Sequence, residues 1–270
     1  MRKSYLSLEQ RIHNAEGAQA AETLHARHAF LHAKSFGDEE WGQVWSHSDD
    51  TSWAHSFGRM RGYDSVYYNN VTTYNCGGQR GYQQMLNILP EIGHFDARAC
   101  RELAMHTLAT DIVEVADDGG TARASFLTPG VLFSTLNANL KCRCMTLWER
   151  YGSDFVYHDG KWWWAHEQVC PDIAGSLDKE NWARTMYDRC KSGHIGPPQS
   201  APKNEDHGPP RTDKSTRHKE WNMWQPVQHT VDPPTPYAHM DEENTYSPGY
   251  NSFDTILPQN RAYGGDVIDD

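Results

Sequence analysis

Proline is distributed unevenly along this chain, and the distribution limits how much of it can fold as one unit. Eleven of the 14 prolines lie at or beyond Pro197, whereas all six cysteines lie at or before Cys190. Residues 191–236 combine proline and glycine with histidine and charge, a composition that favours extended chain over a packed core. We therefore predict one folded domain over residues 1–190, large enough for a single hydrophobic core, and a tail over residues 191–270.

The later part of this tail is rich in apolar side chains. Its aromatic and aliphatic residues are Trp221, Trp224, Tyr237, Tyr246, Tyr250, Phe253, Ile256 and Leu257. So many apolar anchors are unusual for a chain that only meets solvent. We expect the tail to pack on its own domain or on a neighbouring subunit.

The formal net charge of −11 excludes several classes of partner. Binding to a nucleic-acid backbone needs clustered cations, so no nucleic-acid partner is expected. The same charge opposes an anionic membrane surface, and no run of about 18 apolar residues could span a bilayer. The first eight residues contain no apolar stretch of the kind found in export signals. We therefore expect a cytoplasmic protein with reduced thiols and no membrane partner.

Helical patterns come first along the chain. Apolar residues recur at helical spacing over residues 6–34, which predicts a long helix. Asp38 is expected to cap a short helix that holds Trp41 and Trp45. Further helices are expected around residues 63–73, 79–100 and 177–190.

Strand patterns follow the first helices. Strands are expected over residues 51–57, 105–115, 121–127, 141–157 and 161–169, with 58–62 as a turn or short return strand. Residues 117–120 and 158–160 have the composition of hairpin turns, Pro129 and Gly130 are expected to bend the chain, and a bulge is placed near Gly152. Helices followed by antiparallel strands predict an α+β fold. We expect a curved antiparallel sheet wrapped on N-terminal helices, a cone-shaped, cystatin-like roll, with a long extended C-terminal tail.

Three separate segments carry a family resemblance. The first leads from the long helix through Glu39-Glu40-Trp41 and Asp49-Asp50 to Phe57-Gly58-Arg59-Met60-Arg61-Gly62-Tyr63. The second is Met105-His106, an Asp-Gly turn and Thr121-Ala122-Arg123, and the third joins Trp148-Glu149-Arg150-Tyr151 and Phe155-Val156-Tyr157 to Asp159-Gly160-Lys161-Trp162. Together these segments, within residues 8–170, resemble the SnoaL-like families of the nuclear transport factor 2-like superfamily.

This resemblance implies a cone-shaped fold with an apolar pocket. Its members include steroid isomerases, polyketide cyclases, scytalone-type and bile-acid dehydratases, and lyases that release formaldehyde from diaryl compounds, beside many non-catalytic proteins. His106 matches the histidine that the dehydratases place at the start of a pocket strand. The acidic partners of those enzymes fall near Ala33 or Lys34 and near Gly130 here, so their Asp-based dyad is absent from this sequence.

Four histidines are the candidate catalytic residues: His106, His55, His166 and His28. An imidazole titrates near neutral pH and can take and return a proton without a metal. Alternation groups His106 with Leu108 and Ile112 on one strand face. It also places Trp162, Trp164 and His166 on one face and Trp163, Ala165 and Glu167 on the other, and leaves open which face lines the pocket. The competing interpretation of each histidine is a core or interface residue.

Candidate substrate-binding residues surround these histidines. They are Trp53, Phe57, Arg59, Arg143 and Tyr67. Trp53 and Phe57 share a strand face with His55 and suit an aryl ring, whereas the arginines could meet a phenolate or form internal ion pairs. His28 and His32 have the i,i+4 spacing of metal ligands, but no third ligand follows from the spacing, and no metal is predicted. Gly77-Gly78 lacks the spacing of a phosphate loop, and no cofactor is expected.

The function that the sequence favours is a cofactor-independent lyase. It would eliminate water or formaldehyde from a hydrophobic aryl or polycyclic substrate by His-centred acid–base chemistry. Three alternatives remain: an isomerase or cyclase in the same pocket, a non-catalytic binding or assembly subunit, and a metal enzyme that uses His28 and His32. A homo-oligomer formed through the sheet face and the tail is also expected.

Overall fold

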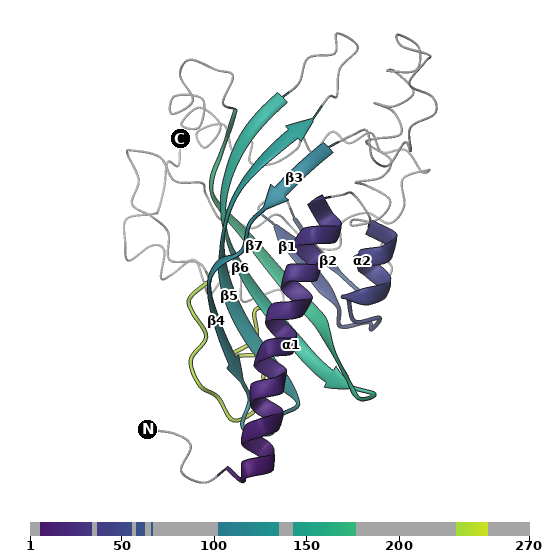
Figure 1. Cartoon of the computed structure of the whole chain (residues 1–270), viewed down its shortest axis with the longest axis vertical. Coiled ribbons are helices and arrows are strands. Elements are labelled where there is room, and N and C mark those ends of the chain that lie inside the picture. Colours follow the sequence, from purple (N-terminus) through teal and green to yellow (C-terminus); the bar gives the residue numbers. More distant parts are fainter. Residues whose placement is uncertain are drawn as a thin grey trace.

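A computed structural model describes residues 6–33, 37–55, 58–62, 66, 102–134, 143–176 and 231–247. Two helices and seven strands follow one another along these residues (Figure 1). The helices are α1 (Leu8–Ala33) and α2 (Gly37–Gln43), and the strands are β1 (Ser52–His55), β2 (Gly58–Arg61), β3 (Glu102–His106), β4 (Ala109–Val115), β5 (Thr121–Ser134), β6 (Arg143–His158) and β7 (Lys161–Ser176). Among the described helices, none has the length and apolar character needed to cross a membrane.

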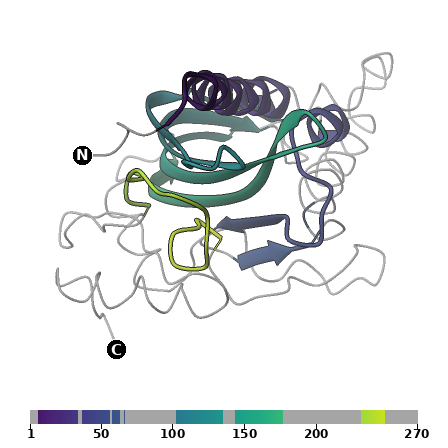
Figure 2. The same ribbon diagram turned by 90° about the horizontal axis from the view of Figure 1, so that it is seen from below.

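One sheet contains all seven strands. Its order is β2-β1-β7-β6-β5-β3, and β4 also pairs with β5. Neighbours are antiparallel except β1 and β7, which run parallel. The sheet curls around α1, which lies along its concave face (Figure 2). The predicted α+β class, with a curved sheet wrapped on N-terminal helices, is confirmed. We call the face toward α1 the inner face and the opposite one the outer face.

Helix α1 begins at a capping box. The Ser7 amide donates to Gln10 Oε1 (2.9 Å) and the Gln10 amide donates to Ser7 Oγ (3.2 Å), so two N-terminal amides gain partners. The buried side of the helix then presents Gly17, Ala21, Leu24, His25 and His28. A Cβ at Gly17 would lie 2.6 Å from the Trp162 ring, so this glycine sets how closely α1 approaches the sheet.

The core lies between α1, α2 and the inner face. Trp45 and Trp164 are fully buried and stack with ring centroids 5.0 Å apart, and Phe155 lies against Trp164. The predicted short helix ends before Trp45, and Asp38 lies inside it rather than at its cap. Trp45 instead forms a strand-like bridge to Trp164, because the backbone groups of Val44 and Ser46 bond to that residue.

Two strand predictions are wrong near the sheet edge. The expected strand over 105–115 divides into β3 and β4. This break, together with the positive φ of Thr110 (52°), interrupts the alternation of side chains between the two faces of the sheet. Ile112 is exposed and does not share an inward face with His106. The chain also continues as one strand through Pro129 instead of bending there. Proline has no N–H to donate to a neighbouring strand, but Pro129 lies opposite the break between β3 and β4, so no hydrogen bond of the sheet is lost.

The bulges lie in β7, not at Gly152. Asp154 pairs with His166 but Phe155 pairs with Trp164, so Ala165 is an extra residue. A second extra residue, Asp172, lies between the partners of Trp148 and Glu149. An extra residue reverses which face the following side chains occupy. The predicted grouping of Trp162, Trp164 and His166 is therefore wrong.

Residues 231–247, which we call the strap, lie on the outer face. Cys170, Val231 and Tyr246 form a small buried cluster there, and the Tyr246 hydroxyl donates to the carbonyl of Asp232 (2.6 Å). Figure 2 shows α1 and the strap on opposite sides of the curled sheet. The helices expected over residues 63–73, 79–100 and 177–190 lie outside the described residues, apart from Val66, which is helical.

Candidate functional site

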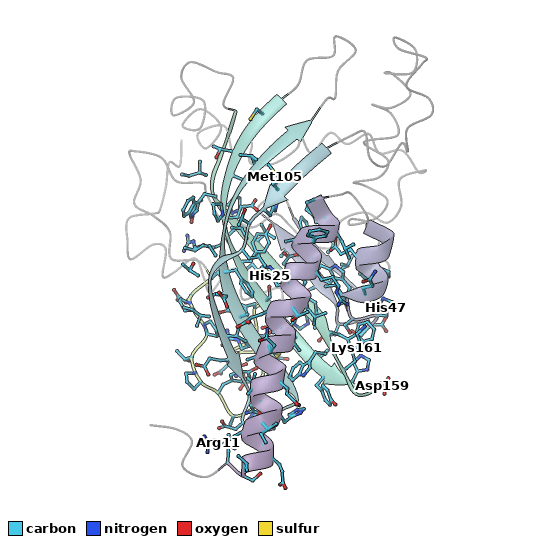
Figure 3. The ribbon with its side chains drawn as sticks, viewed as in Figure 1. Arg11, His25, His47, Met105, Asp159 and Lys161 are labelled. Atoms are coloured by element: carbon cyan, nitrogen blue, oxygen red, sulfur yellow. The ribbon has the colours of Figure 1, made fainter. Side chains whose placement is uncertain are left out.

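Three histidines of α1 form a row toward the inner face. The rings of His25 and His28 stack at 5.9 Å between centroids, and those of His28 and His32 stack at 5.2 Å. His25 and His28 are buried, and His25 lies midway along the helix (Figure 3). Their spacing of three and four residues brings all of these imidazoles to one side of the helix.

His28 forms a buried ion pair with α2. Its Nδ1 lies 2.7 Å from Glu40 Oε1, which also accepts a hydrogen bond from the Trp45 indole (2.9 Å). Burial lowers the pKa of His28, but the Glu40 carboxylate outweighs burial and raises that pKa to about 8. Burial alone would raise the pKa of Glu40, but the charge and hydrogen bond of His28 outweigh burial, and the pKa of Glu40 is lowered. Near neutral pH the pair therefore consists of an imidazolium and a carboxylate.

A second constellation lies on β3 and β6. His106 Nδ1 lies 2.7 Å from the Tyr151 hydroxyl, which donates its proton to Glu149 Oε2 (3.0 Å). Because a phenol has one proton, its oxygen can only accept from the Nδ1–H of His106. Neutral His106 then carries its lone pair on Nε2, the tautomer of a general base. Glu149 Oε2, 3.7 Å from Nδ1, can stabilise the imidazolium that forms when His106 takes a proton.

His32 lies between these two constellations. Its ring centroid is 5.2 Å from that of His28 and 5.4 Å from that of His106. Burial, followed by the charge of His28, lowers the pKa of His32 to about 3. His32 is thus neutral near pH 7, with a charged imidazole on one side and a candidate base on the other.

Glu167 is a buried acid on the inner face of β7. The pKa of Glu167 is raised to about 8, and burial is the largest cause. The charges of Glu40 and Glu149 raise this pKa further, whereas His28 and the Trp53 indole lower it. A carboxyl group with this pKa keeps its proton near neutral pH and can donate a hydrogen bond.

His25 is fully buried, and neither ring nitrogen has a hydrogen-bond partner among the described residues. Its ring packs against Phe126 (3.7 Å between centroids), Trp164 (4.9 Å) and Tyr151 (5.5 Å). Burial and the charge of His28 lower the pKa of His25 well below its ordinary value. His25 is therefore a neutral imidazole between aromatic rings.

The inner face thus brings together groups whose pKa values are shifted in opposite directions: those of His28 and Glu167 are raised, and those of His25 and His32 are lowered. Beside them, His106 when neutral has the tautomer of a base, and aromatic side chains enclose the set. Opposed protonation states in one buried site are the usual basis for assigning an acid and a base. Among the described residues, no group of three or more His, Cys, Asp or Glu side chains could hold a metal ion.

The structure separates the residues that the sequence analysis selected. His106, His28 and Trp53 belong to the inner face. His166 instead lies on the outer face, where Nδ1 is 2.9 Å from Asp154 Oδ2 and Nε2 is 3.1 Å from Asp50 Oδ2. The other selected residues cannot be placed in the site: only the backbone of His55, Arg59 and Arg143 is described, and Phe57 and Tyr67 lie outside the described residues.

Sequence reasoning missed five groups of this site: Glu40, Tyr151, Glu149, Glu167 and His25. Two signals could have found some of them. Glu149 and Tyr151 alternate in one strand and so share a face, and His25 lies three residues before His28 on the helix. Strand alternation predicts that Glu167 lies on the face opposite Trp164, but the bulge at Ala165, which leaves no mark in the alternation, brings both side chains to the inner face.

Comparison with known proteins returns similar structures but no family. No family model matches the chain, and no curated protein matches it. Among solved structures, a protein named provisionally as a scytalone dehydratase, from Novosphingobium aromaticivorans, is 11% identical, with a TM-score of 0.43 over 64% of this chain and 94% of its own.

Two further solved structures are similar at the same level. The hexachlorocyclohexane dehydrochlorinase LinA-type3 from Novosphingobium barchaimii is 13% identical, with a TM-score of 0.42 over 64% of this chain and 95% of its own. A nuclear transport factor 2-like superfamily protein from Salmonella enterica is 15% identical, with a TM-score of 0.42 over 61% of this chain and 97% of its own. A similarity of this degree assigns neither an activity nor a site residue to this chain.

Proposed function

We propose that this protein is a cofactor-independent lyase that eliminates water or formaldehyde from a hydrophobic aryl or polycyclic substrate. The observation that carries the proposal is the hydrogen bonding of two histidines that meet at the inner face. Tyr151 and Glu149 hold His106 as a base, whereas Glu40 holds His28 as an acid. A lyase of this kind needs one group that removes a proton and another that supplies one.

His106 is the proposed base. In a dehydration, Nε2 takes a proton from the substrate carbon while the C–O bond breaks. The positive charge that forms on the imidazole is stabilised by Glu149 (3.7 Å), and Tyr151 keeps the ring in the required tautomer. When the eliminated molecule is formaldehyde, the same nitrogen takes the proton of a hydroxymethyl O–H and a C–C bond breaks.

His28 is the proposed acid. Its proton passes to the departing hydroxyl in a dehydration, or to the carbon that loses formaldehyde. Glu40 and the Trp45 indole fix the ring from the helix side. After one turnover His106 carries a proton and His28 lacks one, and the neutral His32 between them is suited to return it.

Aromatic side chains support the choice of a hydrophobic substrate. Phe126, Trp53 and Trp164 are buried on the inner face, in the layer that contains the titratable groups. Aromatic rings attract other rings through edge-to-face and offset contacts. Burial in such surroundings also strengthens each electrostatic interaction with the reacting atoms.

An isomerase or cyclase is the second candidate, and His32 is the observation that favours it. A neutral imidazole between base and acid could return the abstracted proton to another position of the same substrate. The mass of the product separates the two candidates. A lyase product lacks the mass of one water or one formaldehyde, whereas an isomer keeps the substrate mass and takes up deuterium from heavy water.

The proposal is tested by screening hydrophobic aryl and polycyclic alcohols with mass-spectrometric detection. For an accepted substrate, His106→Asn is expected to lower kcat/KM by about 10²–10⁴-fold, the usual value of one acid–base group. Tyr151→Phe removes only the hydroxyl that orients His106, and a loss of about 10–100-fold is expected.

Tyr157→Phe is the matched control, because Tyr157 lies on the same strand but is exposed. It should keep the native rate. Undiminished turnover in both His106→Asn and Tyr151→Phe, with an accepted substrate in hand, would refute the assignment of the base.

A further inference from the structure

Three buried side chains of the inner face present polar atoms that lack a protein partner. They are the hydroxyl of Ser153, the carboxyl group of Glu167 and both ring nitrogens of His25, each at most 1% exposed. Among the described residues, no hydrogen bond of good geometry reaches these atoms, although the Trp53 indole lies close enough to Glu167 to lower its pKa, so at most one of the two carboxyl oxygens is used. Buried polar atoms are nearly always hydrogen-bonded in folded proteins, so a group of them indicates an external partner.

The sheet register brings two of the three side by side. Ser153 of β6 and Glu167 of β7 are direct cross-strand partners, and both point to the inner face. Side chains in such a pair have Cβ atoms about 4.5–5.5 Å apart. One small molecular group between them could therefore bond to both.

His25 approaches the same region from α1. Its ring contacts Trp164 and Tyr151, and Tyr151 is the next inward residue after Ser153 along β6. His28 acts electrostatically on both His25 and Glu167, so both groups lie near it. The helix and the sheet thus offer polar atoms toward a common interior.

We infer that Ser153, Glu167 and His25 form a polar subsite that binds an uncharged hydroxyl or carbonyl group of the ligand. Each of the three groups is neutral near pH 7 and can both donate and accept a hydrogen bond. Such a set matches an uncharged oxygen, which also offers both capacities. An ammonium group could only donate, and a carboxylate could only accept.

Charges nearby favour the same ligand class. The His28 imidazolium and the Glu40 carboxylate already pair with each other, so neither offers an unpaired charge to a carboxylate or an ammonium group of a ligand. A charged ligand group would also have to lose its hydration in a fully buried region, at high cost. The inference rests on the proposed function, because it takes the inner face as the ligand-binding face.

Binding of small probes tests the subsite without requiring turnover. Benzyl alcohol, toluene, benzoate and benzylammonium share one ring and differ in the polar group. We expect benzyl alcohol to bind at least about tenfold more tightly than toluene, the value of roughly one good hydrogen bond, and both ions to bind more weakly than benzyl alcohol. Calorimetry or the change in tryptophan fluorescence measures each Kd.

Variants then locate the preference. Ser153→Ala and Glu167→Leu should each bring the ratio of the toluene Kd to the benzyl alcohol Kd closer to one. Toluene binding itself should stay unchanged. Glu167→Gln should retain the advantage, because its amide still donates and accepts. Ser125→Ala, a buried serine on the outer face of β5, is the matched control and should behave as the native protein.

A stability measurement separates this role from a structural one. Removing a buried polar atom that has no protein partner is expected to leave Tm unchanged or to raise it, whereas removing a structural hydrogen bond lowers it. Equal binding of benzyl alcohol and toluene, or an advantage that persists in Glu167→Leu, would overturn the subsite and leave buried water as its occupant.

Failure of the subsite and failure of the lyase are distinguishable. If His106→Asn loses turnover while Glu167→Leu keeps the alcohol preference, the subsite is wrong and the acid–base proposal stands. If Glu167→Leu loses the preference but His106→Asn turns over normally, the subsite stands and the proposed base is wrong.

Discussion

Two clusters of histidine and carboxylate lie on opposite faces of β6 and β7, and they differ in how fully their polar atoms are used. On the outer face, His166 bonds to Asp154 with one nitrogen and to Asp50 with the other. Asp154 Oδ2 also accepts from Thr245 Oγ1 (2.5 Å) and the Tyr246 amide (2.7 Å) of the strap. On the inner face, His25, Ser153 and Glu167 keep polar atoms without a protein partner among the described residues.

This difference indicates different purposes. On the outer face, Asp154 Oδ2 bonds to several protein donors while Oδ1 lies 3.8 Å from Arg123 Nε, and this buried ion pair attaches the strap to the sheet. Buried polar groups left for another molecule reduce stability and are retained at sites of binding or chemistry. His166 was a catalytic candidate because of its residue type, but its partners are those of a structural histidine.

The largest expected effect is that of Asp154→Ala. It leaves His166 and the two strap donors without their shared acceptor, and the Asp154 side chain is completely buried. Breaking one side of a buried pair costs about 3–5 kcal/mol. Urea unfolding should show this loss, and proteolysis should cut the released strap faster. Asp159→Ala, at an exposed carboxylate beside His158, is the control and should change neither; an equally stable Asp154→Ala would contradict the structural role of the outer cluster.

The pH dependence of stability is the next largest effect. Burial lowers the pKa of His166, but its bonds to Asp154 and Asp50 outweigh burial and raise that pKa to about 9. Because the folded pKa lies above the unfolded value of 6.5, the stabilisation is complete below pH 6.5 and is lost as pH rises through 9. The loss amounts to about 3 kcal/mol. His166→Gln should flatten the decline of the unfolding free energy over this range, and an unchanged profile would show that His166 is not its source.

Gly152→Ala probes the strap contact alone, with a smaller effect. A Cβ at this position would lie 2.6 Å from the Tyr246 ring and 2.9 Å from Val231. Overpacking of this kind costs about 1–3 kcal/mol. The melting temperature should fall for Gly152→Ala but not for Gly42→Ala, whose added Cβ meets no atom within 4 Å. Similar melting of both variants would mean that the strap does not rest on Gly152.

The smallest effect is expected at His25. Replacement by leucine removes two nitrogens that have no protein partner among the described residues, so stability should change by less than about 1 kcal/mol or rise. His13→Leu on the same helix is the comparison. It loses the bond of Nε2 to the Gly119 carbonyl (2.9 Å) and should cost about 1 kcal/mol. Denaturant unfolding of both variants measures this, and a larger loss at His25 would assign that residue to the fold instead of the ligand.

Local sequence patterns were enough to predict much of the fold. Helical spacing of apolar residues predicted α1, and the Asp-Gly turns predicted the hairpins between β4 and β5 and between β6 and β7. Helices followed by strands gave the α+β class. For the site, residue type and strand position selected His106, and the helical spacing of the histidines in residues 6–34 pointed to His28, because both signals depend only on neighbouring residues.

Partners distant in the sequence could not be predicted in the same way. Glu40 is twelve residues from His28, and Tyr151 is 45 from His106. Such a pair is fixed only when α1 and α2 pack on the sheet. The placement of residues 231–247 on the outer face likewise depends on contacts with β6 and β7 that no local pattern encodes.

The sequence by itself determined the element types, their order and the supply of histidines and carboxylates, because these follow from spacing and composition. Only the tertiary structure decided which of those groups meet. One extra residue at Ala165 turns His166 to the outer face and Glu167 to the inner one. The bulge arises from pairing with β6, a strand encoded elsewhere in the chain, so the division between structural and candidate functional clusters is a property of the assembled sheet.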